Sequence, residues 1–147
     1  MNASDLDLNA LSHALEDSDP DREHFLDLES GSLWTFVFSE ATDETRETYE
    51  TARSAPERWY RIPSRTPQQT FEEIEDFVES LPEGDVQGAL FVALERRGAF
   101  RNFREALMEH QEIRQQWISL SRSKSRDRLA SFLLSMGLSP EPTGATS

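Results

Sequence analysis

The chain of 147 residues contains no cysteine, and Lys124 is the single lysine among its 15 basic residues. Without cysteine it can form no disulfide, no thiolate nucleophile and no cysteine-ligated metal site. No run of roughly 18 apolar residues occurs, and residues 1–19 lack the basic and apolar segments of a secretion signal. These absences predict a cytoplasmic protein with no membrane association.

Motifs for catalysis and for cofactor binding are also scarce. His13, His24 and His110 form no pair at a metal-binding spacing, so each is expected to be an ordinary surface or boundary residue. No serine lies in a Gly-x-Ser-x-Gly elbow, and Gly84 and Gly88 are not followed by the Lys-Ser or Lys-Thr of a phosphate loop. We therefore expect no metal and no cofactor, and the sequence favours a protein that is not an enzyme.

Two groups of acidic residues are candidates for a site. Asp17, Asp19 and Asp21 have the alternate spacing of calcium ligands, but Arg22 and Leu28 stand where a calcium loop needs glycine and glutamate. A solvated acidic linker is the better interpretation of that segment. A hydrolase site is the weakest alternative, since solvated faces and the helix dipole account for its four carboxylates, those of Asp27, Glu29, Glu75 and Asp76.

Charge is distributed unevenly along this chain of net charge -13. Residues 1–57 hold 15 acidic and 3 basic residues, whereas residues 96–147 hold 5 acidic and 9 basic residues. The overall negative charge repels phosphates at long range and disfavours nucleic acid as a partner, although a local basic site stays open as an alternative.

The basic segment 96–104 gathers four arginines and two phenylalanines around Gly98. Guanidinium groups bind carboxylates, phosphates and aromatic faces, and arginine is common at protein interfaces. The leading hypothesis is therefore a non-enzymatic protein-interaction or regulatory module that binds a partner with an acidic segment. The alternative is that these arginines pair with the surplus carboxylates of the chain itself. The predicted binding residues are Arg97, Arg101, Arg104, Arg61 and Arg65.

Hydrophobic periodicity and turn residues divide the chain into short elements. Large apolar residues on both faces of the strand at 32–38 predict a central position in the sheet. Residues 39–55, with Tyr49 as their one large apolar residue, predict a mobile connection or a weak surface helix. The expected order is a helix ending near residue 19, a hairpin of strands 24–29 and 32–38, a strand at 58–62, helices at 66–81 and 85–97, and three shorter helices around 100–107, 113–120 and 129–136, ended by Gly137.

These elements predict an α+β fold, with a small antiparallel sheet made of the hairpin and the third strand and packed with about five to six short helices. A chain of this length forms one domain and buries roughly 70% of its unfolded surface. We expect that domain to span residues 1–138 and to be followed by a disordered tail at 139–147.

Four short motifs resemble a family of bacterial proteins of unknown function, UPF0158. They are Arg61-Ile62-Pro63-Ser64-Arg65, Ile74-Glu75-Asp76-Phe77-Val78, Gly98-Ala99-Phe100-Arg101-Asn102-Phe103 and Trp117. The chain departs from the family pattern at Arg96, where glycine is expected, and at Ile118, where an aromatic residue is expected. The resemblance implies a cytoplasmic α+β domain and carries no activity that could be transferred.

Overall fold

The computed structural model describes residues 5–138 of the chain. These residues form a three-stranded antiparallel sheet and six α-helices, which confirms the predicted α+β class. They divide into two compact units: unit 1 comprises the described residues up to Thr66 and from Ser125 onward, and unit 2 comprises residues 67–124. A single domain over residues 1–138 stays a prediction, and the proposed tail at 139–147 lies outside the described residues.

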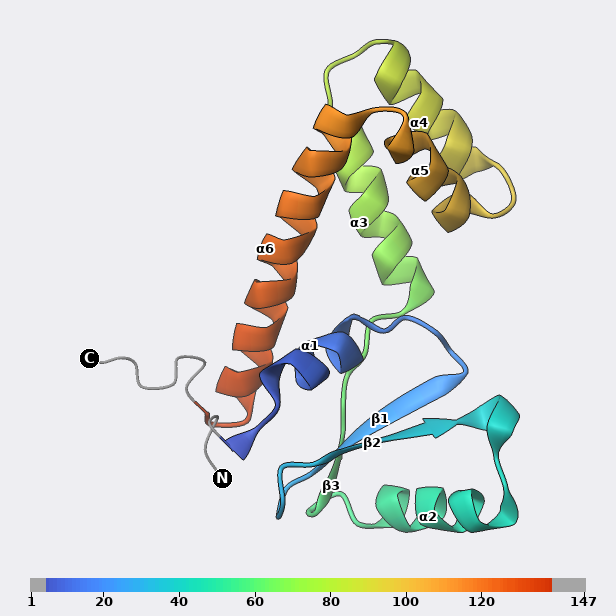
Figure 1. The fold of residues 1–147 in the computed structure, drawn as a ribbon. Helices are drawn as coiled ribbons and strands as arrows, with labels where there is room; N and C mark the ends of the chain where they lie inside the picture. The colour runs from blue at the N-terminus through green and yellow to red at the C-terminus, as the bar shows by residue number, and fades with distance from the viewer. Residues whose placement is uncertain (1–4, 139–147) are drawn as a thin grey trace, which may run out of the picture. The chain divides into compact units, whose positions relative to one another are not determined.

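The sheet belongs to unit 1 and contains the predicted hairpin. β1 (Arg22–Asp27) pairs antiparallel with β2 (Leu33–Val37) on one side and with β3 (Trp59–Arg61) on the other, so the strand order is β2-β1-β3 (Figure 1). The prediction that the second strand is central was therefore wrong, because β1 occupies the centre. Both faces of β2 are apolar because protein covers both faces of the sheet, not because strands flank it on both sides.

One face of the sheet packs against α1 (Leu8–Glu16) and the carboxyl-terminal end of α6 (Gln111–Ser135). Asp7 caps α1 by accepting a hydrogen bond from the N–H of Ala10 at 3.1 Å. The buried cluster on this face consists of Leu6, Leu11, Ala14, Leu15, Leu26, Ile62, Phe132 and Leu133. Residues from both ends of the described chain thus close one side of the sheet.

The opposite face packs against α2 (Asp43–Ser54), which lies in the segment predicted to be mobile or weakly helical (Figure 1). Tyr49 and Ala52 of α2 are buried against Phe25 and Phe36. The rings of Tyr49 and Phe36 stack with centroids 4.4 Å apart. A mobile connection is therefore wrong for this segment, since one tyrosine and one alanine at helical spacing are enough to seat an otherwise acidic helix on an aromatic face.

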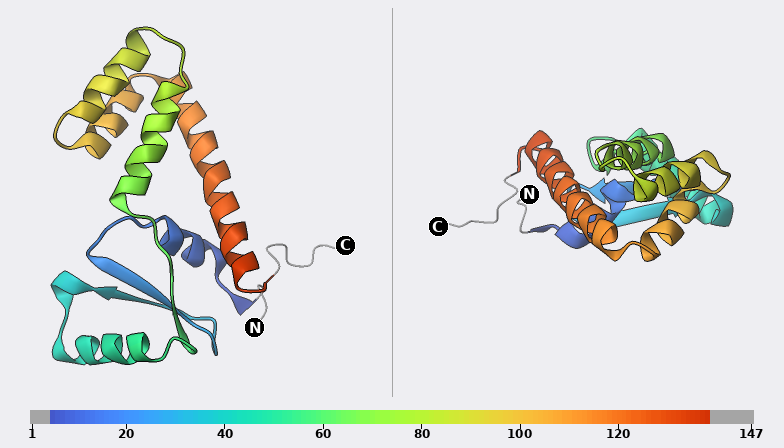
Figure 2. Two further views of the ribbon diagram at one scale, coloured as in Figure 1. Left: turned by 180° about the vertical axis from the view of Figure 1, so that it is seen from behind. Right: turned by 90° about the horizontal axis from the view of Figure 1, so that it is seen from above.

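Unit 2 has its own apolar core, built by α3 (Pro67–Glu79), α4 (Asp85–Glu95), α5 (Ala99–Met108) and the first turns of α6. The two views in Figure 2 show α4 and α5 side by side. The buried residues of this core are Ile74, Phe77, Val78, Leu81, Leu90, Leu94, Phe103 and Leu107.

The last two predicted helices form one continuous helix, α6, of 25 residues. The prediction of separate helices rested on two apolar stripes, around Trp117 and Phe132, with a polar stretch between them. That stretch contains neither proline nor glycine, so nothing ends the helix there; Arg122, Lys124, Arg126 and Asp127 are exposed, and the serines between them are half-buried. The predicted terminator is confirmed, because Gly137 has the left-handed φ of 76°. Within residues 5–138 no helix has the length and apolar character needed to cross a bilayer.

Gly31 in the β1–β2 turn is expected to be intolerant of substitution. Its φ of 81° is left-handed, and a Cβ atom there would lie 2.8 Å from the backbone oxygen of Asp5. Gly31→Ala is therefore expected to lower the free energy of unfolding by about 2 kcal/mol or more, from backbone strain plus this clash. Urea unfolding followed by circular dichroism checks this. Gly98→Ala is the control: φ is 79° but the nearest atom lies 3.9 Å away, so a loss as large as that at Gly31 would contradict the role of the clash.

Candidate interaction surface

The predicted basic segment contains the turn between α4 and α5. Gly98 precedes α5 in the left-handed conformation, with φ 79° and ψ 39°. The side-chain amide of Asn102 donates to the backbone oxygens of Ala93 and Arg97, each at 3.1 Å. These two hydrogen bonds tie the end of α4 to the start of α5 and hold the turn that carries the arginines.

α5 separates its apolar and basic residues onto different faces. Phe103 and Leu107 are buried in the core of unit 2, whereas Arg101 and Arg104 are exposed. Arg101 forms an ion pair with Glu105 one turn later, at 3.2 Å, and the two side chains are 77% and 67% exposed. An ion pair this exposed contributes at most about 0.5 kcal/mol, so it does not fix Arg101 against a partner that offers better geometry.

An open hollow of about 410 Å³ lies between α5 and the first turns of α6. Arg104 and Arg114 both line it, and within residues 5–138 neither guanidinium has an acidic partner. Because Glu105 is engaged by Arg101, the two arginines leave this hollow with an uncompensated positive charge in a strongly acidic chain. Its lining residues are Arg104, Glu105, Leu107, Met108, Arg114, Trp117 and Ile118.

The apolar part of the hollow combines an exposed side chain with a fixed one. Met108 is 62% exposed and lines the hollow. Trp117 is half-buried, and its ring lies 5.4 Å from that of Phe103 and 5.2 Å from that of Phe77. A flexible thioether beside a rigid indole is a surface that can accept an apolar side chain of a partner.

The five arginines predicted as binding residues divide between the two units. Arg97, Arg101 and Arg104 belong to unit 2, and Arg97 is exposed with no ion pair in the described part of the chain. Arg61 and Arg65 belong to unit 1. Arg61 Nε donates to Glu23 Oε1 at 2.8 Å, and Arg65 is half-buried with its backbone N–H bonded to Leu15 O at 3.0 Å. Joint action of the five in one binding surface stays a prediction.

Sequence reasoning predicted a helix around 113–120 but missed that its residues contribute to the hollow. The signal was present, because Arg104, Leu107 and Met108 repeat the i, i+3, i+4 spacing that Arg114, Trp117 and Ile118 also have. What the pattern did not reveal is that a two-residue connection, Glu109–His110, brings these faces together.

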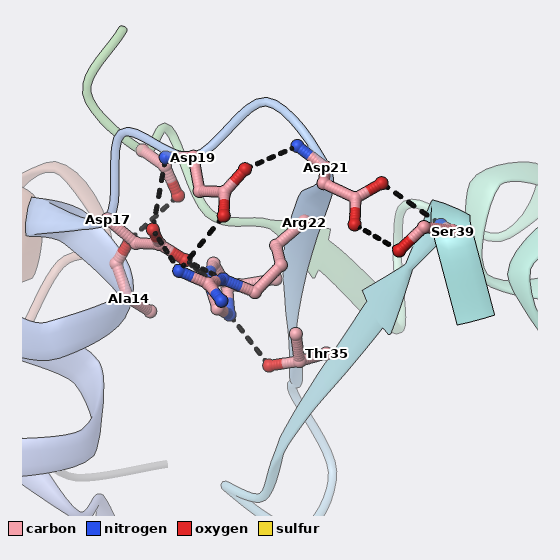
Figure 3. A network of polar contacts seen from close by, with 9 residues as sticks. Ala14, Asp17, Asp19, Asp21, Arg22, Thr35 and Ser39 are labelled. Atoms are coloured by element: carbon pink, nitrogen blue, oxygen red, sulfur yellow. Dashed lines mark hydrogen bonds and ion pairs between the residues drawn. The ribbon is translucent and has the colours of Figure 1, made fainter. Parts of the chain in front are cut away.

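Unit 1 holds a polar network that sequence reasoning also missed (Figure 3). Asp17 accepts two hydrogen bonds from Arg22, at 2.7 and 3.0 Å, and lies 2.7 Å from His24 Nε2. His24 Nδ1 lies 2.7 Å from the hydroxyl oxygen of Thr35 on β2. His24 on β1 thus has a structural role, because its ring contacts both the end of α1 and β2.

The other two acids of the predicted linker organise the same loop (Figure 3). Asp19 accepts from the backbone N–H of Asp21 at 2.9 Å, and Asp21 accepts from the backbone N–H of Ser39 at 3.0 Å. These carboxylates thus hold backbone groups in place. Within residues 5–138 no group of three or more His, Cys, Asp or Glu residues is arranged to hold a metal ion.

The carboxylates of the hydrolase alternative lie in different units, with Asp27 and Glu29 in unit 1 and Glu75 and Asp76 in unit 2. Asp27 is buried and accepts hydrogen bonds from the guanidinium of Arg58, from the backbone N–H of Glu29 and from the hydroxyl of Ser30. Its oxygens are therefore engaged in holding the β1–β2 turn to β3.

Acid is expected to destabilise unit 1 through two of these carboxyl groups. The hydrogen bond from Arg22, assisted by those from His24 and from the Asp19 N–H, holds the pKa of Asp17 well below its ordinary value against the opposing effect of burial. The hydrogen bond from Arg58, assisted by the Glu29 N–H, lowers the pKa of Asp27 to about 2. Both native pKa values lie below the unfolded value of about 3.9, so this stability is complete above about pH 5 and is lost as pH falls toward the native values.

Urea unfolding between about pH 5 and pH 2 measures this effect. The D17N/D27N variant is expected to be less stable than the wild type at pH 5 and to lose less stability on acidification. The control is the D43N/E44Q variant, which removes the same number of negative charges as D17N/D27N. Asp43 and Glu44 are exposed acids at the start of α2. Parallel pH dependence in the wild type and D17N/D27N would contradict the assignment.

The comparisons with known proteins identify the family. The sequence profile described as "Uncharacterised protein family (UPF0158)" matches residues 1–141, so the chain belongs to this family, as its four motifs predict. The chain is 28% identical over 140 residues to the "UPF0158 protein PA5073" of Pseudomonas aeruginosa, an alignment that covers 95% of this chain and 88% of the relative. No solved structure matches the chain.

Proposed function

We propose that this protein is a non-enzymatic interaction or regulatory module whose binding surface is the hollow between α5 and α6 together with Arg97 and Arg101. The observation that carries the proposal is the pair of arginines, Arg104 and Arg114, that line an apolar hollow without an acidic partner in the described residues. In a chain with 28 acidic residues, internal carboxylates are abundant, so two unpaired guanidiniums on one hollow favour a site for an external acid.

The proposed partner is a protein segment that carries an acidic side chain next to a large apolar one. The acid would pair with Arg104 or Arg114, and the apolar side chain would pack on Met108 and Trp117. A volume of about 410 Å³ is large enough for side chains of a partner and too small for a folded domain. We place this interaction in the cytoplasm, because the chain has no cysteine and therefore no disulfide that reducing conditions would break.

Affinity capture from the source organism tests the proposal. Proteins captured by the tagged wild type and by the R101E/R104E variant are compared by quantitative mass spectrometry. The control is R46E/R126E, which changes the charge equally at exposed arginines of unit 1. The proposal predicts at least one protein lost from R101E/R104E and retained by the control. If the folded R101E/R104E variant retained every partner, the proposal would be rejected.

Nucleic acid is the second candidate ligand, because guanidiniums without internal acids, such as those of Arg97 and Arg104, also suit phosphates. The net charge of -13 opposes it. Salt distinguishes the two candidates: binding to DNA or RNA would weaken with a log–log slope of about 0.9 per phosphate contact, and an absent or flat response removes this candidate.

A further inference from the structure

β2 is an edge strand that has none of the usual protections against pairing with another strand. Its five residues, Leu33–Val37, include no charged residue, no proline and no glycine. Edge strands of natural proteins are normally blunted by lysine, by proline, by a bulge or by a covering segment. Thr35 at the middle of β2 is exposed, and Phe38 immediately after the strand is 37% exposed.

The hydrogen-bond ladder shows which backbone groups face this outer edge. The N–H of Phe38 bonds to Asp21 O, and the N–H of Asp27 bonds to Ser32 O, each at 2.8 Å. The pairs Asp21/Phe38 and Asp27/Ser32, at the two ends of the β1–β2 ladder, are therefore hydrogen-bonded pairs. Bonded pairs alternate along an antiparallel ladder, so Trp34 and Phe36 bond to β1. The residues between and beside them, Leu33, Thr35 and Val37, direct their N–H groups outward, where residues 5–138 provide no backbone acceptor.

The other edge of the sheet is different. β3 has three residues, and its outward Trp59 N–H bonds to Ala55 O at 2.8 Å. Pro63 follows two residues after the strand and cannot donate to a further strand. The sheet is therefore closed to strand addition at β3 and open at β2.

We infer that β2 is a self-association surface, on which the β2 strand of a second copy of this chain pairs antiparallel about a two-fold axis at Thr35. In that register Leu33 lies opposite Val37 of the second copy, and Thr35 lies opposite its own equivalent. Leu33, Thr35 and Val37 are the residues whose N–H groups point away from β1. In this register each of these N–H groups donates to a backbone carbonyl of the second copy.

The side chains also fit this register. Trp34 lies opposite Phe36 of the second copy on the face of the sheet covered by α2, and the aliphatic pair of Leu33 and Val37 lies on the other face. No charged side chain of β2 meets its equivalent. The product is a continuous sheet that contains the three strands of each copy.

Salt is expected to promote this pairing. Each copy carries a net charge of -13, so two copies repel one another at low ionic strength. The Debye length falls from about 10 Å at 0.1 M salt to about 3 Å at 1 M, which screens that repulsion and leaves backbone hydrogen bonds and apolar contacts. Binding of an acidic partner to Arg104 and Arg114 has the opposite salt dependence, so the two surfaces can be tested separately.

Light scattering coupled to size exclusion on the full chain tests the inference, with a concentration series at about 0.1 M and about 1 M sodium chloride. The wild type is expected to shift from monomer toward dimer as salt and protein concentration rise. In the dimer the two copies of residue 35 are about 5.5 Å apart between Cα atoms. T35E and T35K are each expected to be monomeric, because like charges then oppose one another, and an equal mixture of the two is expected to form a heterodimer.

Hydrogen exchange on the wild type gives a test that needs no variant. The N–H groups of Leu33, Thr35 and Val37 are expected to gain protection under the conditions that give the dimer. A wild type that stays monomeric at every salt concentration would overturn the inference and leave the edge to a strand of a different protein. A dimer whose three N–H groups exchange as fast as in the monomer, or folded T35E and T35K variants that stay monomeric when mixed, would overturn it as well.

Discussion

Replacing Arg104 and Arg114 together by glutamate is expected to weaken the binding of an acidic partner segment by a factor of about 100 or more. Each guanidinium that bonds to a carboxylate contributes about 1.5 kcal/mol or more, and about 1.4 kcal/mol corresponds to a factor of ten. Reversal of both charges also puts glutamates beside the incoming acid, which adds repulsion. Isothermal titration with a segment of a captured partner measures the affinity.

The R46E/R126E variant changes the net charge of the chain by the same amount outside the hollow. It is expected to bind the segment less than about threefold more weakly than the wild type, because neither Arg46 nor Arg126 lines the hollow and exposed charges are screened by salt. Equal losses in R104E/R114E and R46E/R126E would show that overall charge, and not the hollow, governs binding.

Phe103→Ala is expected to lower the free energy of unfolding of unit 2 by about 3–5 kcal/mol. Phe103 is 1% exposed, and its ring meets those of Phe77 and Trp117 edge-on, at 6.5 and 5.4 Å. Truncation removes these contacts and leaves a cavity beneath the hollow. Because Trp117 is the single tryptophan of unit 2, its indole N–H resonance reports the unfolding of that unit in urea.

Met108→Ala is the matched change on the same helix. Met108 is 62% exposed, so its truncation is expected to change stability by less than about 0.5 kcal/mol while weakening partner binding. If Phe103→Ala lowered the free energy of unfolding by less than about 1 kcal/mol, the Phe103 ring would not be a main source of stability in the core of unit 2.

Local patterns predicted the elements whose apolar residues follow a simple period. The hairpin could be predicted because residues around Ser30-Gly31 alternate on either side of a turn, and α5 because Phe100, Phe103 and Leu107 lie on one face. Arg101 and Arg104 lie on the same helix, and both are exposed. In each case one short segment contains all the information that is needed.

Properties that depend on distant segments could not be predicted in this way. The edge position of β2 depends on β3 pairing with β1, more than 20 residues along the chain, and the apolar pattern of β2 is the same in either position. The hollow depends on two helices that contribute similar faces, and the role of His24 depends on Asp17 and Thr35 approaching it from α1 and β2. Such contacts join separate helices and strands, and the periodicity within one element does not reveal them.

The most direct test of the interaction surface uses the three tryptophans of the chain as reporters. Trp117 lines the hollow, whereas Trp34 and Trp59 pack on the aromatic face of the sheet in unit 1. In a titration of the ¹⁵N-labelled protein with the captured partner segment, the indole N–H resonance of Trp117 is predicted to shift in proportion to occupancy, while those of Trp34 and Trp59 stay in place. A Trp117 resonance that does not move at saturation would contradict the account.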